Sequence, residues 1–525
     1  MRVDLTVNPF EVPPRETAQR LLASYMATVQ SSFPFLPEAS FNRQVDQYYD
    51  SMSIGTHISI STKWLAVLNF VFATGAKYSQ LVEQEWPIDD QDDHVYYSRG
   101  HSLSSIDGSP LIGKPDLLEI QMTAILAFYF LSVGHVNRAW VVIGHSLRYA
   151  YALGLHMRNE NRAATILQKE IIARIWWGLY SLEGTISTIV GRPTFLIEDF
   201  CSVPLPLPLP IEQILDEAQQ NETCEYFSMS SIQVDSVTSQ PSNAGSYLRS
   251  RVQIGRITQE INIELYSPAV VAKSWKHMQQ TMARLYEKLE AWLASLPSGL
   301  SFAQTNVDSS FQRERQILQI LYIENKILIT RPCLCRFDTR IVNQTQAADD
   351  FNKRTARICV EAANAMADLL PDCIDVTHLY KMGPWWSVVH NLMQGLVVLL
   401  LEMSYNTVHF QEGKEILAPA KKLLRGLRLM ATRNQTAERA YAIAFRALKD
   451  LASKSNADIS DIIWEDTTRT AFLFEAEPAV GEHDPRYSFP AGAPDQVFES
   501  QGVYPNSFGG QVGYASMFDP HGTAH

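Results

Sequence analysis

Five consecutive positions, Asp89-Asp90-Gln91-Asp92-Asp93, are the residues of this sequence whose types and spacing are best suited to hold a metal ion. Carboxylate oxygens are the hard ligands that magnesium prefers in proteins. Four carboxylates within one turn of chain could therefore bind Mg²⁺ and, through it, a diphosphate. Such chemistry also needs a cavity, so the surrounding elements decide whether the cluster is a site.

The spacing of Asp89, Asp90 and Asp93 is similar to the DDxxD pattern of magnesium-dependent all-α terpenoid synthases, which hold a prenyl diphosphate in an apolar helical cavity. Two features disfavour that interpretation. The segment follows Pro87 in a polar stretch, not inside an apolar helix, and no second magnesium motif occurs downstream at suitable spacing. A solvated acidic loop before the next helix is the favoured reading, and the synthase is kept as the alternative.

Other residues with nucleophilic or metal-binding side chains do not complete a known motif. The run Gly144-His145-Ser146-Leu147-Arg148 begins like a nucleophile elbow, but Arg148 replaces the second glycine and the run falls within a helical pattern. Cys333 and Cys335 are one residue apart without a second cysteine pair, so free thiols are expected there rather than zinc ligands. The sequence therefore predicts no enzyme, no catalytic residue and no cofactor or metal site in this chain.

Charge and composition exclude two further classes of function. The 525 residues carry a formal net charge of −12, and most of this comes from residues 458–525, which contain 11 acidic and 2 basic residues. The remainder is nearly neutral and lacks the basic excess of a nucleic-acid-binding surface. The apolar run 396–401 is too short to span a membrane, and the N-terminus has no signal-peptide core. Six scattered cysteines fit a reducing compartment, so we expect a soluble intracellular protein without membrane contact.

The elements that would position these residues are helices. In residues 135–210, apolar side chains recur at steps of three and four over two stretches, which predicts two amphipathic helices that pack against each other. Gly154 is placed to end the first helix, and Gly191 followed by Pro193 is placed to end the second. Similar patterns predict helices over 62–82 and over 116–133, with Asp116 as the N-cap of the latter.

Almost no segment alternates as a strand does, so the predicted fold is all-α, an array of antiparallel amphipathic helix pairs. Composition suggests four parts: a first helical half over 1–216, a polar flexible linker over 217–250, a second helical half over 251–457, and a tail over 458–525. The tail interleaves ten aromatic residues with its carboxylates, which is typical of disordered acidic activation segments.

The identities of the residues in 116–210 resemble the signature of the fungal-specific transcription factor regulatory domain, the middle homology region of the binuclear zinc-cluster regulators. The resemblance extends over about residues 15–455. The matching positions, to which the resemblance assigns a structural role, are Trp140, Gly144, Arg148, Gly154, His156, Arg174, Trp176, Trp177, Tyr180, Glu183, Gly191, Arg192 and Pro193.

One position departs from the family pattern. Relatives usually have an Asp-Arg pair after the tyrosine, whereas this chain has Glu183-Gly184. Glu183 lies near the apolar stripe of its helix, and a lone buried carboxylate would be costly. We therefore expect Glu183 to form an ion pair with Arg148 or Arg192 that fixes how two helices meet.

The resemblance implies a regulator of RNA polymerase II transcription in the nucleus, whose helical body integrates a signal and whose tail contacts coactivators. The partners it implies are coactivators or repressors, a second copy in a homodimer, and a small-molecule effector. In the family, DNA is contacted by an N-terminal six-cysteine cluster that binds zinc, but residues 1–100 contain no cysteine. DNA contact is therefore expected only through a zinc-cluster module that is separate or lost by truncation. A non-catalytic helical scaffold is a second alternative.

Overall fold

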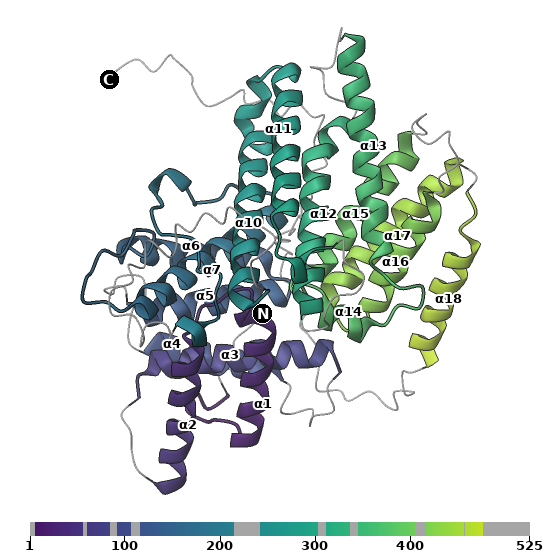
Figure 1. Ribbon diagram of the computed structural model, residues 1–525. Helices are drawn as coiled ribbons and strands as arrows, with labels where there is room; N and C mark the ends of the chain where they lie inside the picture. Colours follow the sequence, from purple (N-terminus) through teal and green to yellow (C-terminus); the bar gives the residue numbers. More distant parts are fainter. Residues whose placement is uncertain are drawn as a thin grey trace, which may run out of the picture.

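The computed structural model describes residues 6–55, 60–83, 92–106, 116–214, 242–302, 311–335, 345–405, 416–455 and 457–475. Within these ranges every regular element is a helix, so the predicted all-α class is confirmed (Figure 1). No helix in the described part of the chain is both long enough and apolar enough to cross a membrane.

The first half packs around helix α3, which contacts α1, α4 and α5, while α6 lies between α5 and α7. Gly75 on α3 permits the close crossing with α1, because a Cβ at this position would collide with the carbonyl oxygen of Leu21. The sequence did not predict α4, whose amphipathic pattern is weak. The elements are α1 Arg15–Tyr25, the π-helix η1 Met26–Gln30, α2 Glu38–Ile54, α3 Thr62–Leu81, α4 Asp93–Ile106, α5 Leu117–Ser132, α6 Val136–Ala152, α7 Ile166–Val190 and the 3₁₀ turn η3 Glu198–Phe200.

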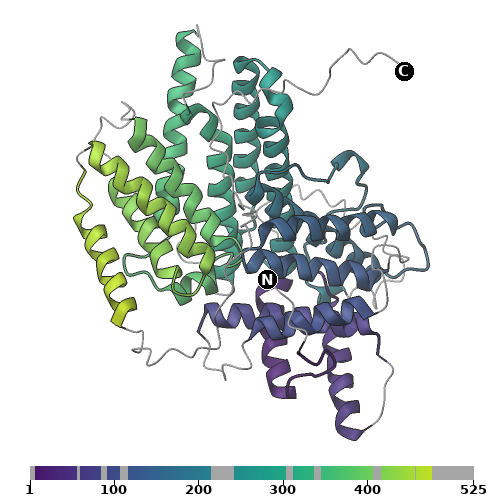
Figure 2. The same cartoon turned by 180° about the vertical axis from the view of Figure 1, so that it is seen from behind.

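The second half consists of long helices that stand side by side in both views, beginning with α10 to α13 (Figures 1 and 2). Helix α12 packs on α13, and α15 packs on α13, α16 and α17. The elements are α10 Ala244–Tyr266, η5 Pro268–Ala272, α11 Trp275–Ala294, η6 Ser298–Leu300, α12 Gln312–Leu334, α13 Gln346–Asp368, α14 Val376–Met382, α15 Val388–Tyr405, α16 Leu417–Met430, α17 Gln435–Ser455 and α18 Ser460–Glu475.

Short-range sequence signals correctly predicted where α5 begins and where α6 and α7 end. The Asp116 carboxylate accepts a hydrogen bond from the Glu119 amide at the start of α5. Gly154, just after α6, and Gly191, the C-cap of α7, have φ angles of 74° and 64°, the left-handed conformation that glycine adopts most easily. Helices α6 and α7 pack against each other as predicted.

Two expected boundaries were misplaced. Helix α10 begins at Ala244, so residues 244–250 belong to the second half and not to the linker; residues 215–241 lie outside the described residues. Asn243 starts this helix through a capping box with Ser246, a polar pair whose composition alone resembles that of the linker. The tail boundary at 458 is also too early, because α18 covers 460–475 and buries Ile459 and Ile462 against the body. Residues 476–525, most of the predicted tail, lie outside the described residues.

The two halves share one continuous hydrophobic core. At their junction, Phe33 and Phe128 of the first half contact Trp385 and Trp386, which lie between α14 and α15. The ring centroids of Phe33 and Trp386 are 5.1 Å apart, and those of Phe128 and Trp385 are 5.5 Å apart. Edge-on aromatic contacts contribute stabilisation beyond that of the apolar area they bury, so packing holds the two halves together.

Candidate functional site

The α6–α7 pair holds most of the signature residues, and Trp176 is its most deeply buried large side chain. The Trp176 ring packs edge-on against Tyr151 of α6, with 5.3 Å between centroids, and near His156, at 5.8 Å. The carbonyl oxygen of His156 accepts hydrogen bonds from the amides of Ser202 and Val203. His156 therefore joins the end of α6 to the segment that follows α7 through its backbone carbonyl.

The Leu-Pro segment 203–210 is held on α7 by side chains of that helix. Prolines have no amide to donate, so the carbonyl groups of such a segment need donors from elsewhere. Trp177 Nε1 donates to the carbonyl of Pro204 at 2.8 Å, and Arg174 Nη2 donates to that of Leu209 at 2.7 Å. The Arg174 Nε atom also donates to the carboxylate of Glu170 at 2.6 Å. Glu170 was not predicted from the sequence, although its spacing of four residues from Arg174 was a usable signal.

Arg148 and Arg192 bind aromatic rings. The Arg192 guanidinium lies 4.9 Å from the centroid of the Trp140 ring, and that of Arg148 lies 5.1 Å from the Phe195 ring. Trp140 and Phe195 in turn pack together with 5.7 Å between centroids. The Phe195 ring packs over Gly144, where a Cβ would be in ordinary van der Waals contact with it. The turn formed by Gly191, Arg192 and Pro193 thus folds back over α6.

The prediction that Glu183 forms an ion pair with Arg148 or Arg192 is wrong. Glu183 is fully buried, but one oxygen accepts hydrogen bonds from the Phe195 amide and the Ser187 hydroxyl, both at 3.2 Å. The other oxygen has no hydrogen-bond partner among the described residues. No arginine reaches it because Arg148 and Arg192 lie exposed on the aromatic stack. Burial without a cation raises the pKa of Glu183 to about 7.

Tyr180 connects the signature helix to the second half. Its hydroxyl donates to Glu198 at 3.2 Å, and Glu198 forms an ion pair with Arg256 of α10 at 2.5 Å. The hydrogen bonds from Arg256 lower the pKa of Glu198. Sequence reasoning missed this contact because Glu198 and Arg256 are 58 residues apart and follow no local pattern.

Of the aspartate cluster, only Asp92 and Asp93 lie within the described residues. Asp93 begins α4, and its carboxylate accepts hydrogen bonds from Tyr129 at 2.6 Å and from Gln80 at 2.8 Å. Asp89 and Asp90 lie outside the described residues. In the described ranges, no group of three or more His, Cys, Asp or Glu side chains could hold a metal ion.

Three further residues with potentially nucleophilic side chains are Ser146, Cys333 and Cys335, and all three are buried or partly buried among the helices. The Ser146 hydroxyl donates to the carbonyl of Ile120 on α5 at 3.0 Å, as expected for a small packing residue within a helix. Cys333 is a buried free thiol and Cys335 a partly buried one. Burial raises the pKa of both, and this keeps them in the unreactive protonated form.

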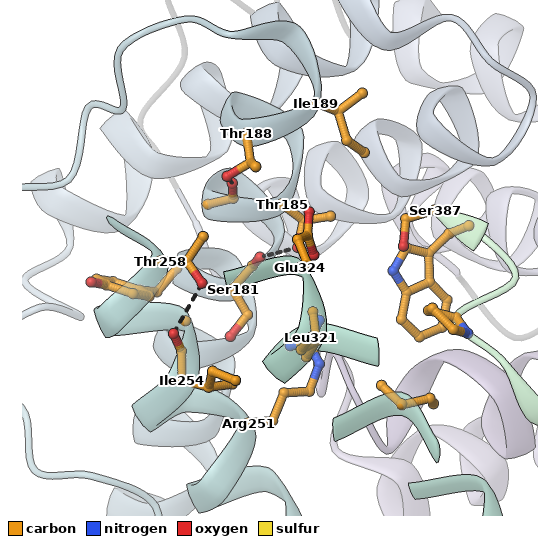
Figure 3. Close-up of a pocket in the computed structure, with 16 residues that line it drawn as sticks. Ser181, Thr185, Thr188, Ile189, Arg251, Ile254, Thr258, Leu321, Glu324 and Ser387 are labelled. Atoms are coloured by element: carbon orange, nitrogen blue, oxygen red, sulfur yellow. Dashed lines mark hydrogen bonds between the residues drawn. The ribbon is translucent and has the colours of Figure 1, made fainter. Parts of the chain in front are cut away.

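A small cavity of about 40 Å³ lies where the two halves meet. Figure 3 shows its lining residues, which come from α7, α10, α12 and the turn before α15. The polar members are mostly hydroxyls, but they include one cation and one anion, Arg251 and Glu324. Sequence reasoning identified neither residue, because the cavity joins helices that are distant in the chain.

Comparison with known proteins agrees with the signature. A sequence model of the fungal specific transcription factor domain matches residues 22–294, more than half of the chain. This match runs from within α1 to the last residue of α11.

Three curated relatives extend the comparison. The transcription regulator galc of Aspergillus niger is 26% identical over 87% of this chain and 61% of its own length. The thiamine repressible genes regulatory protein thi1 of Schizosaccharomyces pombe is 22% identical over 86% of this chain and 53% of its own length. The activator of stress genes 1 of Saccharomyces cerevisiae is 22% identical over 74% of this chain and 38% of its own length. The chain thus spans about half the length of the relatives it matches.

Proposed function

Because this chain belongs to the fungal specific transcription factor domain family, we propose that it is the regulatory region of a fungal transcription regulator acting on RNA polymerase II genes in the nucleus. The helical body receives a signal, and the acidic-aromatic segment at the C-terminal end passes it to coactivators or repressors. The match over 22–294 carries this proposal. The names of the relatives support it, since each is a transcription regulator or activator.

DNA contact is proposed to come from a separate zinc-cluster module. The body is nearly neutral, and the counterion release that drives DNA binding needs a concentration of basic residues. The regulatory region would then act through protein contacts and through its own response to a signal. No catalytic step is proposed, because Asp93, one of the three residues that favoured the synthase alternative, is bonded to Tyr129.

A tethering experiment tests this function. The full chain is fused to a heterologous DNA-binding domain and assayed on a reporter with matching sites. We expect reporter output to differ from that of the DNA-binding domain alone. An unchanged output would contradict the regulatory assignment and favour the inert scaffold.

The contribution of the tail is tested in the same assay by replacing its carboxylates with amides. We expect a lower output, because the negative charge keeps the aromatic residues of such a segment extended and available to a partner. The control replaces the exposed body carboxylates Glu160, Glu212 and Glu287 with glutamine and should leave output unchanged. Equal output from both variants would remove the tail from the mechanism. The carboxylates to be replaced are those of the tail beyond α18, namely Glu477, Glu482, Asp484, Asp495, Glu499 and Asp519.

A further inference from the structure

The cavity between the two halves is lined by a buried cation that has no carboxylate partner. Arg251 of α10 is 3% exposed and forms no ion pair with any described residue. Its guanidinium lies 4.1 Å from the centroid of the Phe33 ring, and its Nη1 atom donates to the carbonyl of Ser32 at 3.0 Å. Its Nε atom makes no hydrogen bond with the described residues. Burying a charge without a counter-ion is costly, so this arginine is suited to receive an anionic group.

The same cavity is lined by an incompletely paired anion. Glu324 of α12 is 7% exposed, and its nearest cationic group is the His390 Nε2 atom at 3.5 Å. A histidine compensates a carboxylate only in its protonated form. The described residues provide no lysine or arginine within ion-pair distance of Glu324. Figure 3 shows Arg251 and Glu324 coming from two different helices toward the same group of lining residues.

Two glycines line the cavity. Gly184 of α7 and Gly255 of α10 both line it, and a Cβ added to either would meet no atom within 4 Å. Glycine in the middle of a helix is less favourable than alanine, and it is usually required where two backbones approach closely, as at Gly75. Gly184 and Gly255 have no such close approach, and a methyl group at either position would enter open space.

The size and the lining of the cavity limit which molecules can bind in it. Its volume of about 40 Å³ is several times the roughly 10–15 Å³ that one water molecule needs. The Ser181 hydroxyl has no hydrogen-bond partner in the described residues, whereas that of Thr258 donates to its own helix and keeps its oxygen as an acceptor. A small polar molecule with both donors and acceptors fits this lining.

We propose that this cavity binds a small zwitterion of the α-amino acid class, with its carboxylate on Arg251 and its ammonium group directed at Glu324. A simple carboxylate would leave Glu324 uncompensated, and a simple amine would leave Arg251 uncompensated. The ligand would contact α7 of the first half and α10 and α12 of the second half. Its role as the effector of the regulator rests on the proposed function, whereas the binding itself does not.

Binding is tested by calorimetric titration of the full chain with glycine, alanine and serine. Propionate, ethylamine and glycerol are the reference compounds, since they offer only the anion, only the cation or only hydroxyls. We expect the amino acids to bind and each reference compound to bind about tenfold or more weakly, because charge-assisted hydrogen bonds are lost. Equal binding of alanine and propionate, or no amino-acid binding, would overturn the proposal.

Matched variants locate the site. Arg251→Gln and Glu324→Gln should each weaken alanine binding about 10- to 100-fold, while Arg249→Gln should not, since Arg249 binds the carbonyl of Pro206 outside the cavity. Gly184→Met fills the cavity without a charge change and should abolish binding, whereas Gly184→Ala should retain it. Undiminished binding by the Gly184→Met protein would place the ligand elsewhere.

The two proposals fail separately. Calorimetry uses no reporter, so an absence of binding leaves the regulatory assignment intact. If alanine binds and the tethered chain still has no effect on the reporter, the binding site stands and the regulatory function fails.

Discussion

Helix α7 carries two buried carboxylates, Glu170 and Glu183, and the cost of burying each one is compensated differently. Glu170 receives a charged partner from one turn further along the helix, Arg174, and the amide of Leu207 adds a hydrogen bond at 3.0 Å. Glu183 receives only neutral donors, the Phe195 amide and the Ser187 hydroxyl. A buried carboxylate without a cation favours its protonated form, so the pKa of Glu183 rises.

The stability of the protein should therefore depend on the ionisation of Glu183. Burial raises its folded-state pKa from 4.5 to about 7. Its contribution is fully present below pH 4.5 and is lost as the pH rises through 7, because the unfolded chain releases this proton more readily. Glu183→Gln mimics the protonated form and should stabilise the protein at pH 8 by up to about 3 kcal/mol. Denaturant unfolding of both proteins between pH 4.5 and 8 measures the difference.

Glu198 should show the opposite dependence of stability on pH. Hydrogen bonds from Arg256 lower the pKa of Glu198, so Glu198→Gln should lose stability at neutral pH and show little change well below the ordinary pKa of the carboxyl. A Glu183→Gln protein that is no more stable than the wild type at pH 8 would show that Glu183 is ionised and compensated in the folded state.

Removing Arg174, the cationic partner of Glu170, should destabilise the protein more than removing an exposed arginine. Arg174→Met leaves a fully buried carboxylate without its charge partner, and we expect the free energy of unfolding to fall by about 3–5 kcal/mol. The double replacement Glu170→Leu and Arg174→Met should recover much of this loss, because no charge remains buried. Arg148→Met is the control, since Arg148 is exposed and should cost less than about 1 kcal/mol. Equal losses for the single and double variants would mean that packing, not charge, sets the cost.

Among the elements, helix α18 is attached to the body by a set of ion pairs. Asp461 lies 2.7 Å from Lys421 and 2.6 Å from Arg425, and Glu465 lies 2.8 Å from Arg425 and 2.9 Å from Arg428. The three basic residues share one face of α16, and the apolar contribution comes from Ile459 and Ile462. Charge complementarity therefore determines where the first part of the predicted tail lies.

We expect the docking of α18 to depend on salt. Amide hydrogen exchange in residues 460–475 should be faster at high ionic strength than at low, because these pairs are only partly buried and are screened. Arg425→Glu should produce the same acceleration at low salt. Reversing all five charges, with Lys421→Glu and Arg428→Glu beside Arg425→Glu and with Asp461→Arg and Glu465→Arg on α18, should restore protection. Exchange in α16 itself serves as the control and should change little, and salt-independent exchange of α18 would assign its docking to the two isoleucines.

The sequence predicted those features of the fold that depend on near neighbours. The Asp116 cap, the glycines at 154 and 191 and the stripes of α6 and α7 each require only residues within a few turns. Helix α4 was missed because its apolar residues do not form a clear stripe. The partner of Glu183 could not be predicted, because the donor at Phe195 lies in the irregular segment after α7. The two charged residues of the cavity, Arg251 and Glu324, are 73 positions apart in the chain, and no local pattern relates them.

At the scale of the whole molecule, the two halves interlock through polar contacts as well as through the aromatic cluster. Tyr247 and Arg251 of α10 bind Ser32, and Gln259 donates to the carbonyl of Leu196 at 2.6 Å. Farther along the chain, Arg313 donates to the carbonyl groups of Ala27 and Thr28. These contacts connect segments more than 60 residues apart, so neither half has a separate core.

This interlocking predicts that the covalent connection between the halves is dispensable once the protein has folded. A specific protease site inserted at residue 230 permits cleavage between the halves without touching a described element. The fragments should remain together in size-exclusion chromatography at native pH and unfold in one transition with denaturant, because separating them would expose the shared apolar surface. A second protein with Trp385→Ala and Trp386→Ala weakens the junction, and its cleaved fragments should separate at lower denaturant concentration. If the wild-type fragments separate without denaturant, each half carries a self-sufficient core, and a ligand bound between them could not join them into one signalling unit.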